Sequence, residues 1–185
     1  MTLLISMYPA RRPPTGLQSY RARGFTIIEL LITVAILVIL IGLAAPSLGN
    51  LVRDQRVKTA VGDVYAALVF ARSEAIKRNA TVNVVSPASD WAGGWEVRAG
   101  VTVLNRQDAL GGINIDAKDQ ITDAAITTVS YLGDGRLSTA SGRPTFNLKS
   151  SESGATTTAR CVRLDLSGRP NVKVDTNNNP ADGCQ

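Results

Sequence analysis

An apolar run from Phe25 to Ala45 is the feature that most constrains this chain. Its 21 residues form a helix of about 31 Å at 1.5 Å per residue, close to the roughly 30 Å hydrocarbon core of a bilayer. Glu29 is the only charged residue between Arg23 and Arg53. Burying an ionised carboxylate in hydrocarbon costs several kcal/mol unless it finds a partner. The run therefore predicts a membrane-spanning helix in which Glu29 needs a cation beside it.

The basic residues before this run predict its orientation. Cytoplasmic flanks of membrane helices are rich in Lys and Arg. The N-terminus is therefore expected in the cytoplasm and everything after Pro46 outside, and the four arginines concerned are Arg11, Arg12, Arg21 and Arg23. The alternative is a secretory signal peptide cleaved near Leu43-Ala44-Ala45. Glu29 and an apolar run longer than the usual 7 to 15 residues argue against that alternative.

Gly24 followed by Phe25-Thr26-Ile27-Ile28-Glu29-Leu30 resembles the class III signal of type IV prepilins and pseudopilins. The resemblance implies that prepilin peptidase cuts between Gly24 and Phe25 and methylates the new amine of Phe25. It also implies that Glu29 neutralises the terminal amine of a neighbouring subunit during filament assembly. That ammonium would supply the cation that a buried carboxylate requires.

The rest of the chain predicts one periplasmic domain. Residues 1–24 form the leader, 25–46 the membrane half of a helix, 47–79 its amphipathic half, and 80–185 a β domain. The amphipathic assignment rests on apolar residues at steps of three and four, namely Leu51, Val57, Val61, Val64, Leu68, Ala71 and Ala75. Pro46 is expected to kink or melt the helix locally.

After Asn79 the pattern becomes extended, with short runs bounded by Gly, Ser, Asn and Asp. The strands are expected at residues 81–85, 95–104, 125–132, 145–149, 161–166 and 170–174, and 105–123 is expected to be an irregular loop. The fold class is therefore α+β, with one long N-terminal helix packed on an antiparallel sheet or a small β-sandwich.

Residue types exclude several functions. The sequence has no histidine, so histidine-based catalysis and the usual zinc sites are excluded. No nucleophile–base pair or phosphate-cradling glycine loop occurs, so we expect no enzyme, no cofactor and no metal site. Cys161 and Cys184 both lie in the part placed outside the membrane, where oxidising conditions favour a disulfide. Four of the 20 Lys and Arg lie in the leader, which leaves 16 against 15 acids.

Two further stretches resemble the GspH/FimT type of minor pseudopilin. One is Gly94-Trp95-Glu96-Val97, where a Gly-Trp pair opens a strand; we expect Trp95 in the core and a turn at Trp91–Gly94. The other is the terminal hairpin from Cys161 to Lys173. The resemblance implies a pilin fold and a minor pilin of a type IV pilus at or near the filament tip, resident in the inner membrane before assembly. Its implied partners are prepilin peptidase and other pilin subunits. A GspH-type subunit of a type II secretion system remains an alternative.

The terminal hairpin also raises a DNA-binding alternative. A three-residue loop Ser167-Gly168-Arg169 predicts that Arg163 opposes Lys173, while Leu166, Val172 and Val174 lie on a buried face. Arg163, Arg169 and Lys173 are the candidate DNA-binding residues, with Arg136 and Arg143 as the next candidates. Gly168-Arg169-Pro170 is similar to the first half of the Gly-Arg-x-Arg element of FimT proteins that take up DNA, but Asn171 replaces its second arginine. The competing interpretation is a solvated hairpin face.

The tail segment Asp175–Pro180 begins like a calcium loop, with oxygen ligands at positions one, three and five. Pro180 stands where a calcium loop needs glycine, and no glutamate follows at position twelve. The segment is expected to form an Asx-type turn rather than a metal site.

Overall fold

The structure, a computed structural model, describes residues 24–87, 90–152, 157–177 and 184. The chain divides into two compact units, residues 1–43 and 44–185. The boundary falls inside helix α1 (Ile27–Arg78), two residues before Pro46. Most of the predicted leader, and Asn178 to Pro180 of the tail, lie outside the described residues.

In the first unit, α1 begins after Thr26 because that residue caps it. The Glu29 backbone N–H donates to Thr26 Oγ1 at 3.3 Å, which satisfies one of the free donors of the first turn. Apolar side chains from Ile27 to Leu43 are exposed within this chain on every side of the helix. No single helix in the described part of the chain has the length and hydropathy of a membrane span, whereas Ile27–Leu43 and Leu48–Arg78 satisfy both criteria as a pair.

In the second unit, α1 is amphipathic and covers the β domain. The predicted apolar face is buried: Val57, Val61, Val64, Leu68, Ala71 and Ala75 are all at most 5% exposed. The assignment of Leu51 to that face was wrong, since Leu51 is 54% exposed. It precedes Val57 by six positions, and at 100° per residue this places it about 120° away around the helix.

The helix ends at Arg78 with a C-terminal cap. Asn79 adopts a left-handed backbone with φ of 47°. The Ala80 N–H donates to the Ala75 carbonyl and the Asn79 N–H to the Ile76 carbonyl, both at 3.2 Å, which is the Schellman arrangement. The chain therefore reverses into the first strand.

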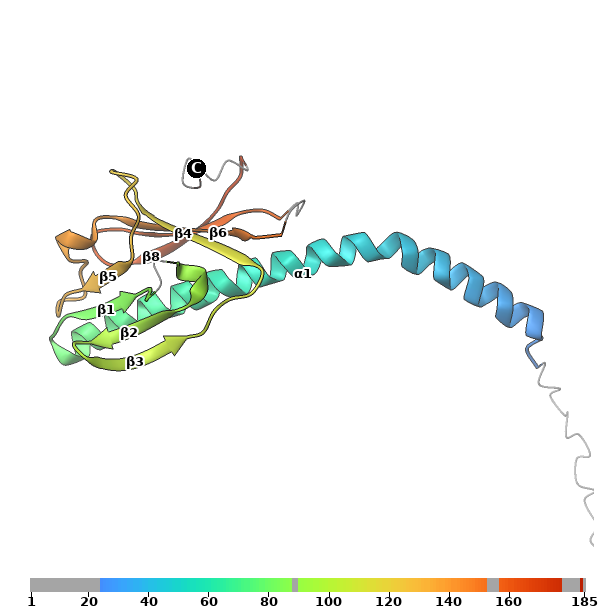
Figure 1. Cartoon of the computed structure of the whole chain (residues 1–185), viewed down its shortest axis with the longest axis horizontal. Helices are drawn as coiled ribbons and strands as arrows, with labels where there is room; N and C mark the ends of the chain where they lie inside the picture. The colour runs from blue at the N-terminus through green and yellow to red at the C-terminus, as the bar shows by residue number, and fades with distance from the viewer. Residues whose placement is uncertain (1–23, 88–89, 153–156, 178–183, 185) are drawn as a thin grey trace, which may run out of the picture. The chain divides into compact units, whose positions relative to one another are not determined.

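Two four-stranded antiparallel sheets complete the domain (Figure 1). The first has the order β3-β2-β1-β5 and the second the order β4-β6-β7-β8. This confirms the α+β prediction of a long helix on antiparallel β structure. The strands are β1 (Val82–Val85), β2 (Trp95–Ala99), β3 (Thr102–Gln107), β4 (Ile113–Asp119), β5 (Thr128–Tyr131), β6 (Pro144–Ser150), β7 (Arg160–Leu164) and β8 (Pro170–Val174). Short 3₁₀ helices lie at η1 (Trp91–Gly93) and η2 (Thr139–Ser141).

Two predictions about the strands were wrong. The run 95–104 is a hairpin rather than one strand, because Gly100 turns the chain with φ of 60° between β2 and β3. The expected loop 105–123 contains the end of β3 and all of β4. In β4 the apolar residues Ile113, Ile115 and Ala117 alternate with polar ones, and the short period was hidden by the Asn and Asp residues between them.

Both tryptophans pack in the core, which confirms the prediction for Trp95. Trp95 is 1% and Trp91 2% exposed. Trp91 lies edge-on to Phe146 with ring centroids 4.7 Å apart, and its indole Nε1 donates to the Ile126 carbonyl at 2.6 Å. The aromatic body is buried and its polar edge is satisfied, as a buried tryptophan requires.

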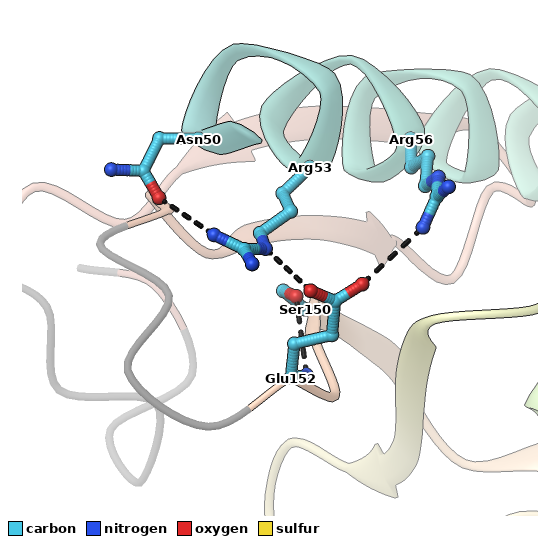
Figure 2. A network of polar contacts seen from close by, with 5 residues as sticks. All are labelled: Asn50, Arg53, Arg56, Ser150 and Glu152. Atoms are coloured by element: carbon cyan, nitrogen blue, oxygen red, sulfur yellow. Dashed lines mark hydrogen bonds and ion pairs between the residues drawn. The ribbon is translucent and has the colours of Figure 1, made fainter. Parts of the chain in front are cut away.

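A polar cluster joins α1 to the chain after β6 (Figure 2). The Glu152 carboxylate accepts from Arg53 Nε at 2.5 Å and from Arg56 Nη1 at 3.3 Å. Arg53 also donates to Asn50 Oδ1 at 3.0 Å, and the Glu152 N–H donates to Ser150 Oγ at 3.3 Å. These groups are partly exposed, so they add orientation more than stability.

The predicted disulfide is present between Cys161 and Cys184, with Cα atoms 6.1 Å apart. Cys161 lies on β7 and is fully buried, and Cys184 is 1% exposed. The bond closes a loop of sequence separation 23 and fixes position 184 against the second sheet.

We predict that Cys161→Ser lowers the free energy of unfolding by about 2 to 5 kcal/mol, because the unfolded chain regains loop entropy. The measurement is thermal unfolding of the full chain in detergent. The double variant Cys161→Ser/Cys184→Ser should match the single variant, and reductant should shift only the wild type. A wild-type midpoint that reductant leaves unchanged would contradict the prediction.

Candidate functional site

A cleft of about 540 Å³ on the second sheet brings four cations together: Arg143, Arg163, Arg169 and Lys173. Asp165 is the only carboxylate among its described lining residues. The structure therefore places the three residues singled out in the sequence around one cleft. It adds Arg143, whereas Arg136 is not among the residues that line it.

The predicted register of the hairpin was wrong by two residues. Arg163 opposes Asn171, and Lys173 opposes Cys161. The loop runs from Asp165 to Arg169 rather than over three residues, and the Asp165 N–H donates to the Arg169 carbonyl at 3.4 Å. Arg163 and Lys173 consequently do not face each other as a like-charged pair. Leu166 lies in the loop and is 45% exposed.

The burial predicted for β8 was also wrong. Val172 and Val174 are each 42% exposed, although they share a face with buried residues of β7. Among the described strands, β8 is the outermost of its sheet, so only one of its edges pairs with another strand.

Asp165 extends the loop because its side chain forms a local turn. Its Oδ1 accepts from Ser167 Oγ at 2.5 Å and from the Arg169 N–H at 3.1 Å. The Ser167 hydrogen bond is the main reason that the pKa of Asp165 lies below its usual value. The carboxylate is thus held by its own loop rather than by an ion pair across the cleft.

Gly168 docks this loop on the domain. Its φ of 77° is a left-handed conformation, which glycine adopts without strain. A Cβ at residue 168 would lie 2.4 Å from the Gly135 carbonyl oxygen and 2.9 Å from Cε1 of Tyr131. That carbonyl also accepts from Arg72 Nε of α1 at 2.9 Å. Glycine is required here by close approach as well as by conformation.

Two residues that the sequence analysis missed, Asp119 and Gln120, hold the chain at Arg143. The Arg143 N–H donates to Asp119 Oδ2 at 2.6 Å, and the Gln120 N–H donates to the Arg143 carbonyl at 3.0 Å. Asp119 Oδ1 accepts the N–H groups of Ile121 and Thr122 at 2.9 and 2.8 Å. Led by the bond from Arg143, these backbone donors lower the pKa of Asp119 to about 2.

The Asp119-Gln120-Ile121-Thr122 stretch carried a signal for Asp119, because an aspartate often accepts N–H groups two or three residues on. Nothing in the sequence marked Gln120. Its contacts are with residues more than 20 positions away.

The side chains of the cleft are mostly not neutralised. Within the described residues, Arg143, Arg169 and Lys173 form no side-chain hydrogen bond or salt bridge with a carboxylate. Arg163 Nη2 donates to Gln120 Oε1 at 3.1 Å, a neutral acceptor. The cleft therefore has the charge and the free donors to bind an anion.

The predicted processing and assembly residues lie in the first unit. Gly24 and Phe25 lie just before Thr26, the residue that caps α1, and Glu29 lies in the first turn of the helix. All three are exposed within this chain. The Glu29 carboxylate has no ion pair in the part of the chain that the structure describes.

The described part of the tail contains the expected Asx-type contact. The Asn177 N–H donates to Asp175 Oδ1 at 3.2 Å. Among the described residues, no group of three or more His, Cys, Asp or Glu could hold a metal ion.

Comparison with known proteins assigns the family. The profile described as "Type II transport protein GspH" matches residues 60–168, more than half of the chain. The chain belongs to the GspH family. A second profile, the prokaryotic N-terminal methylation motif, matches residues 19–45. No curated protein sequence matches this GspH-family chain.

The fold is that of a minor pilin. Two crystal structures of the type IV minor pilin FimU of Pseudomonas aeruginosa strain PAO1 resemble this GspH-family chain. For the form in space group P21, the TM-score is 0.54 and the sequence identity is 18%. The match covers 64% of the GspH-family chain and 89% of the FimU chain. For the P65 form the values are 0.52, 20%, 63% and 91%. This likeness concerns the fold alone.

We predict that Asp119→Asn lowers the free energy of unfolding by about 1 to 2 kcal/mol near neutral pH. The folded pKa is depressed from 3.8 to about 2. The stabilisation by Asp119 is therefore complete above the unfolded pKa and is lost as the pH falls from about 4 to about 2. Denaturant unfolding as a function of pH measures this.

Asp116→Asn is the matched control, since Asp116 lies on the same strand with a side chain 54% exposed and only a 3.9 Å contact to Lys118. The control should keep the wild-type pH dependence between pH 4 and pH 2. An Asp119→Asn variant that keeps it too would contradict the prediction.

Proposed function

We propose that this chain is a minor pilin, a structural subunit of a type IV pilus that is anchored in the inner membrane and then incorporated into the filament. The observation that carries the proposal is one chain with the methylation motif at residues 19–45 and the GspH domain at 60–168. The terminal disulfide and the FimU-like fold support a pilus over a type II secretion pseudopilus, which is the alternative. A place at or near the filament tip is part of the proposal.

The proposed organisation follows the sequence. Residues 1–24 are the leader, 25–46 the membrane and assembly segment, 47–79 the amphipathic helix, and 80–185 the periplasmic domain. Exposed apolar side chains over Ile27–Leu43 support this, since each aliphatic side chain gains about 1.5 to 3 kcal/mol when fully buried. Lipid covers them before assembly, and neighbouring subunits cover them afterwards. The role is structural and not catalytic, which the complete lack of histidine supports.

Glu29 is the proposed assembly contact. Its carboxylate lies one turn from the proposed new N-terminus, the amine of Phe25. A carboxylate buried with an ammonium avoids most of the cost of an unpaired buried charge. A neighbouring subunit would supply that ammonium, so only correctly staggered subunits would pair.

The first prediction of this proposal is that the mature protein begins at Phe25 and carries an N-methyl group there. The motif supplies the cleavage site, and the arginines of the leader keep it in the cytoplasm. Mass spectrometry of the protein purified from membranes measures both. A mature N-terminus near Ala45, or an uncut chain, would overturn the pilin proposal.

Glu29→Ala should leave membrane insertion and cleavage intact, because the segment becomes more apolar. Incorporation into sheared filaments should fall severalfold, because the terminal amine of the neighbour loses its partner. Quantitative immunoblotting of membrane and filament fractions measures both. Thr33→Ala in the same segment is the control, since Thr33 donates only to its own helix at the Leu30 carbonyl. Equal incorporation of Glu29→Ala and the control would refute the pairing role.

A second candidate function is DNA binding, favoured by the four cations that line the cleft and that form no salt bridge within the described residues. We propose it as the alternative role of this subunit, in a competence pilus. The mature chain is nearly neutral in sum, so such binding depends on this local cluster rather than on overall charge.

The triple variant Arg163→Ala/Arg169→Ala/Lys173→Ala should weaken binding to duplex DNA without changing sequence preference. Each lost phosphate contact removes about 0.9 from the slope of log K against log salt, so the slope should flatten by about two to three. Fluorescence anisotropy over a salt series measures it. If the triple variant retains the wild-type slope, the cleft is not the DNA site.

A further inference from the structure

We propose that Gln120 and Arg143 complete the cleft as an ordered site for the phosphodiester backbone, with Gln120 as the positioning residue for Arg163. This inference rests on the second candidate function, DNA binding. It differs from a diffuse basic patch in one respect: the direction of a guanidinium is set before the ligand arrives.

The amide of Gln120 has only one orientation that satisfies its surroundings. Its Nε2 donates one hydrogen to the Pro144 carbonyl at 3.3 Å and the other to the Leu164 carbonyl at 3.1 Å. With both hydrogens used, Oε1 must accept, and Arg163 Nη2 lies 3.1 Å from it. Exchanging the amide oxygen and nitrogen would place the amide oxygen against two carbonyl oxygens and the amide NH2 group against a guanidinium, so the assignment is fixed by chemistry.

This arrangement orients Arg163 without neutralising it. An acceptor that carried a charge, such as a carboxylate, would cancel the attraction for an anion. A neutral amide holds one N–H of the five on the guanidinium and leaves the rest for a ligand. Holding the side chain in advance reduces the rotamer entropy that binding would otherwise cost.

Arg143 enters the cleft from the segment before β6, separate in sequence from the terminal hairpin. Its backbone is held on both sides, by Asp119 through its N–H and by Gln120 through its carbonyl. The two-residue segment 119–120 therefore fixes the start of the Arg143 side chain and the direction of the Arg163 side chain. A linear ligand with regularly repeated charges suits cations supplied by two separate segments, and DNA is such a ligand.

The test measures the affinity of the full-length protein, in uncharged detergent, for a labelled DNA duplex over a salt series. Arg143→Ala should flatten the salt slope by about 0.9, because one phosphate contact is lost. Gln120→Met should lower the affinity about two- to tenfold with the slope unchanged, because Arg163 still reaches a phosphate but must be ordered by it. Gln120→Glu should flatten the slope by about 0.9, because the carboxylate pairs with Arg163.

Arg136→Ala is the matched control, an exposed arginine outside the cleft, and should change neither quantity. Thermal unfolding of each variant separates loss of fold from loss of binding. The affinity of Gln120→Met is interpreted only if its thermal unfolding matches that of the wild type. Arg143→Ala tests the cleft independently of Gln120.

The outcomes separate the inference from the function beneath it. If wild type binds no better than a variant with Arg143, Arg163, Arg169 and Lys173 all changed to Ala, DNA binding at the cleft fails. A second outcome is that wild type binds DNA more tightly than that variant, while Arg143→Ala and Gln120→Met both keep the affinity and salt slope of Arg136→Ala. In that case DNA binding stands and the ordered site is overturned. Equal affinity for polyglutamate and DNA would also overturn it, since the cleft would then suit an acidic protein.

Discussion

The burial of one face of α1 against both sheets is the interaction on which the β domain depends. Residues from Val57 to Ala75 form one cluster with strands of both sheets, including Val97 of β2 and Phe146 of β6. Small residues such as Ala71 let the helix approach closely, and the larger Leu68 fills the space between the layers. Neither four-stranded sheet could shield its inner face alone, so the helix packs against both sheets and completes a single core.

The same helix has opposite requirements along its length. Over Ile27–Leu43 apolar side chains lie on every side and Glu29 is the one charged residue, whereas over its second half an apolar stripe faces the core and charged residues face away. A helix that is apolar all round is stable only where lipid or other helices surround it. The unit boundary near Pro46 coincides with this change of composition. The second unit buries its own core, whereas the apolar side chains of Ile27–Leu43 need lipid or other helices to cover them. This need is the physical basis for proposing a subunit that assembles.

Sequence reasoning succeeded where a regular period met a regular environment. The helical face around Leu68 and the burial of Trp95 followed from spacing and size, and the cysteine pair followed from compartment chemistry. It failed in β4, where apolar residues such as Ile113 alternate with polar residues and the sequence predicted a loop. It also failed in the hairpin register, because a single side chain, that of Asp165, lengthens the turn by local hydrogen bonds. A two-residue shift preserves which face each residue lies on, so the cations stayed together while their cross-strand partners changed.

The cleft shows why a site of this type cannot be predicted from the spacing of residues along the sequence. Each of its cations, taken alone, is an ordinary surface residue, and residues 25–185 carry 16 Lys and Arg against 15 acids, a formal charge close to zero. What makes the group distinct is a set of contacts over long sequence distances, from Gln120 to Pro144 and Leu164 and from Asp119 to Arg143. One partner in each of those contacts is a backbone carbonyl or N–H group, which nearly every residue has, so residue types do not predict them. Within the described residues, the carboxylates of Asp119 and Asp165 accept from backbone N–H groups and a hydroxyl and form no salt bridge with the cations of the cleft. An acid that stabilises a turn cannot also neutralise a neighbouring arginine to the same degree, so the hydrogen bonds that shape these turns also preserve the positive charge of the cleft.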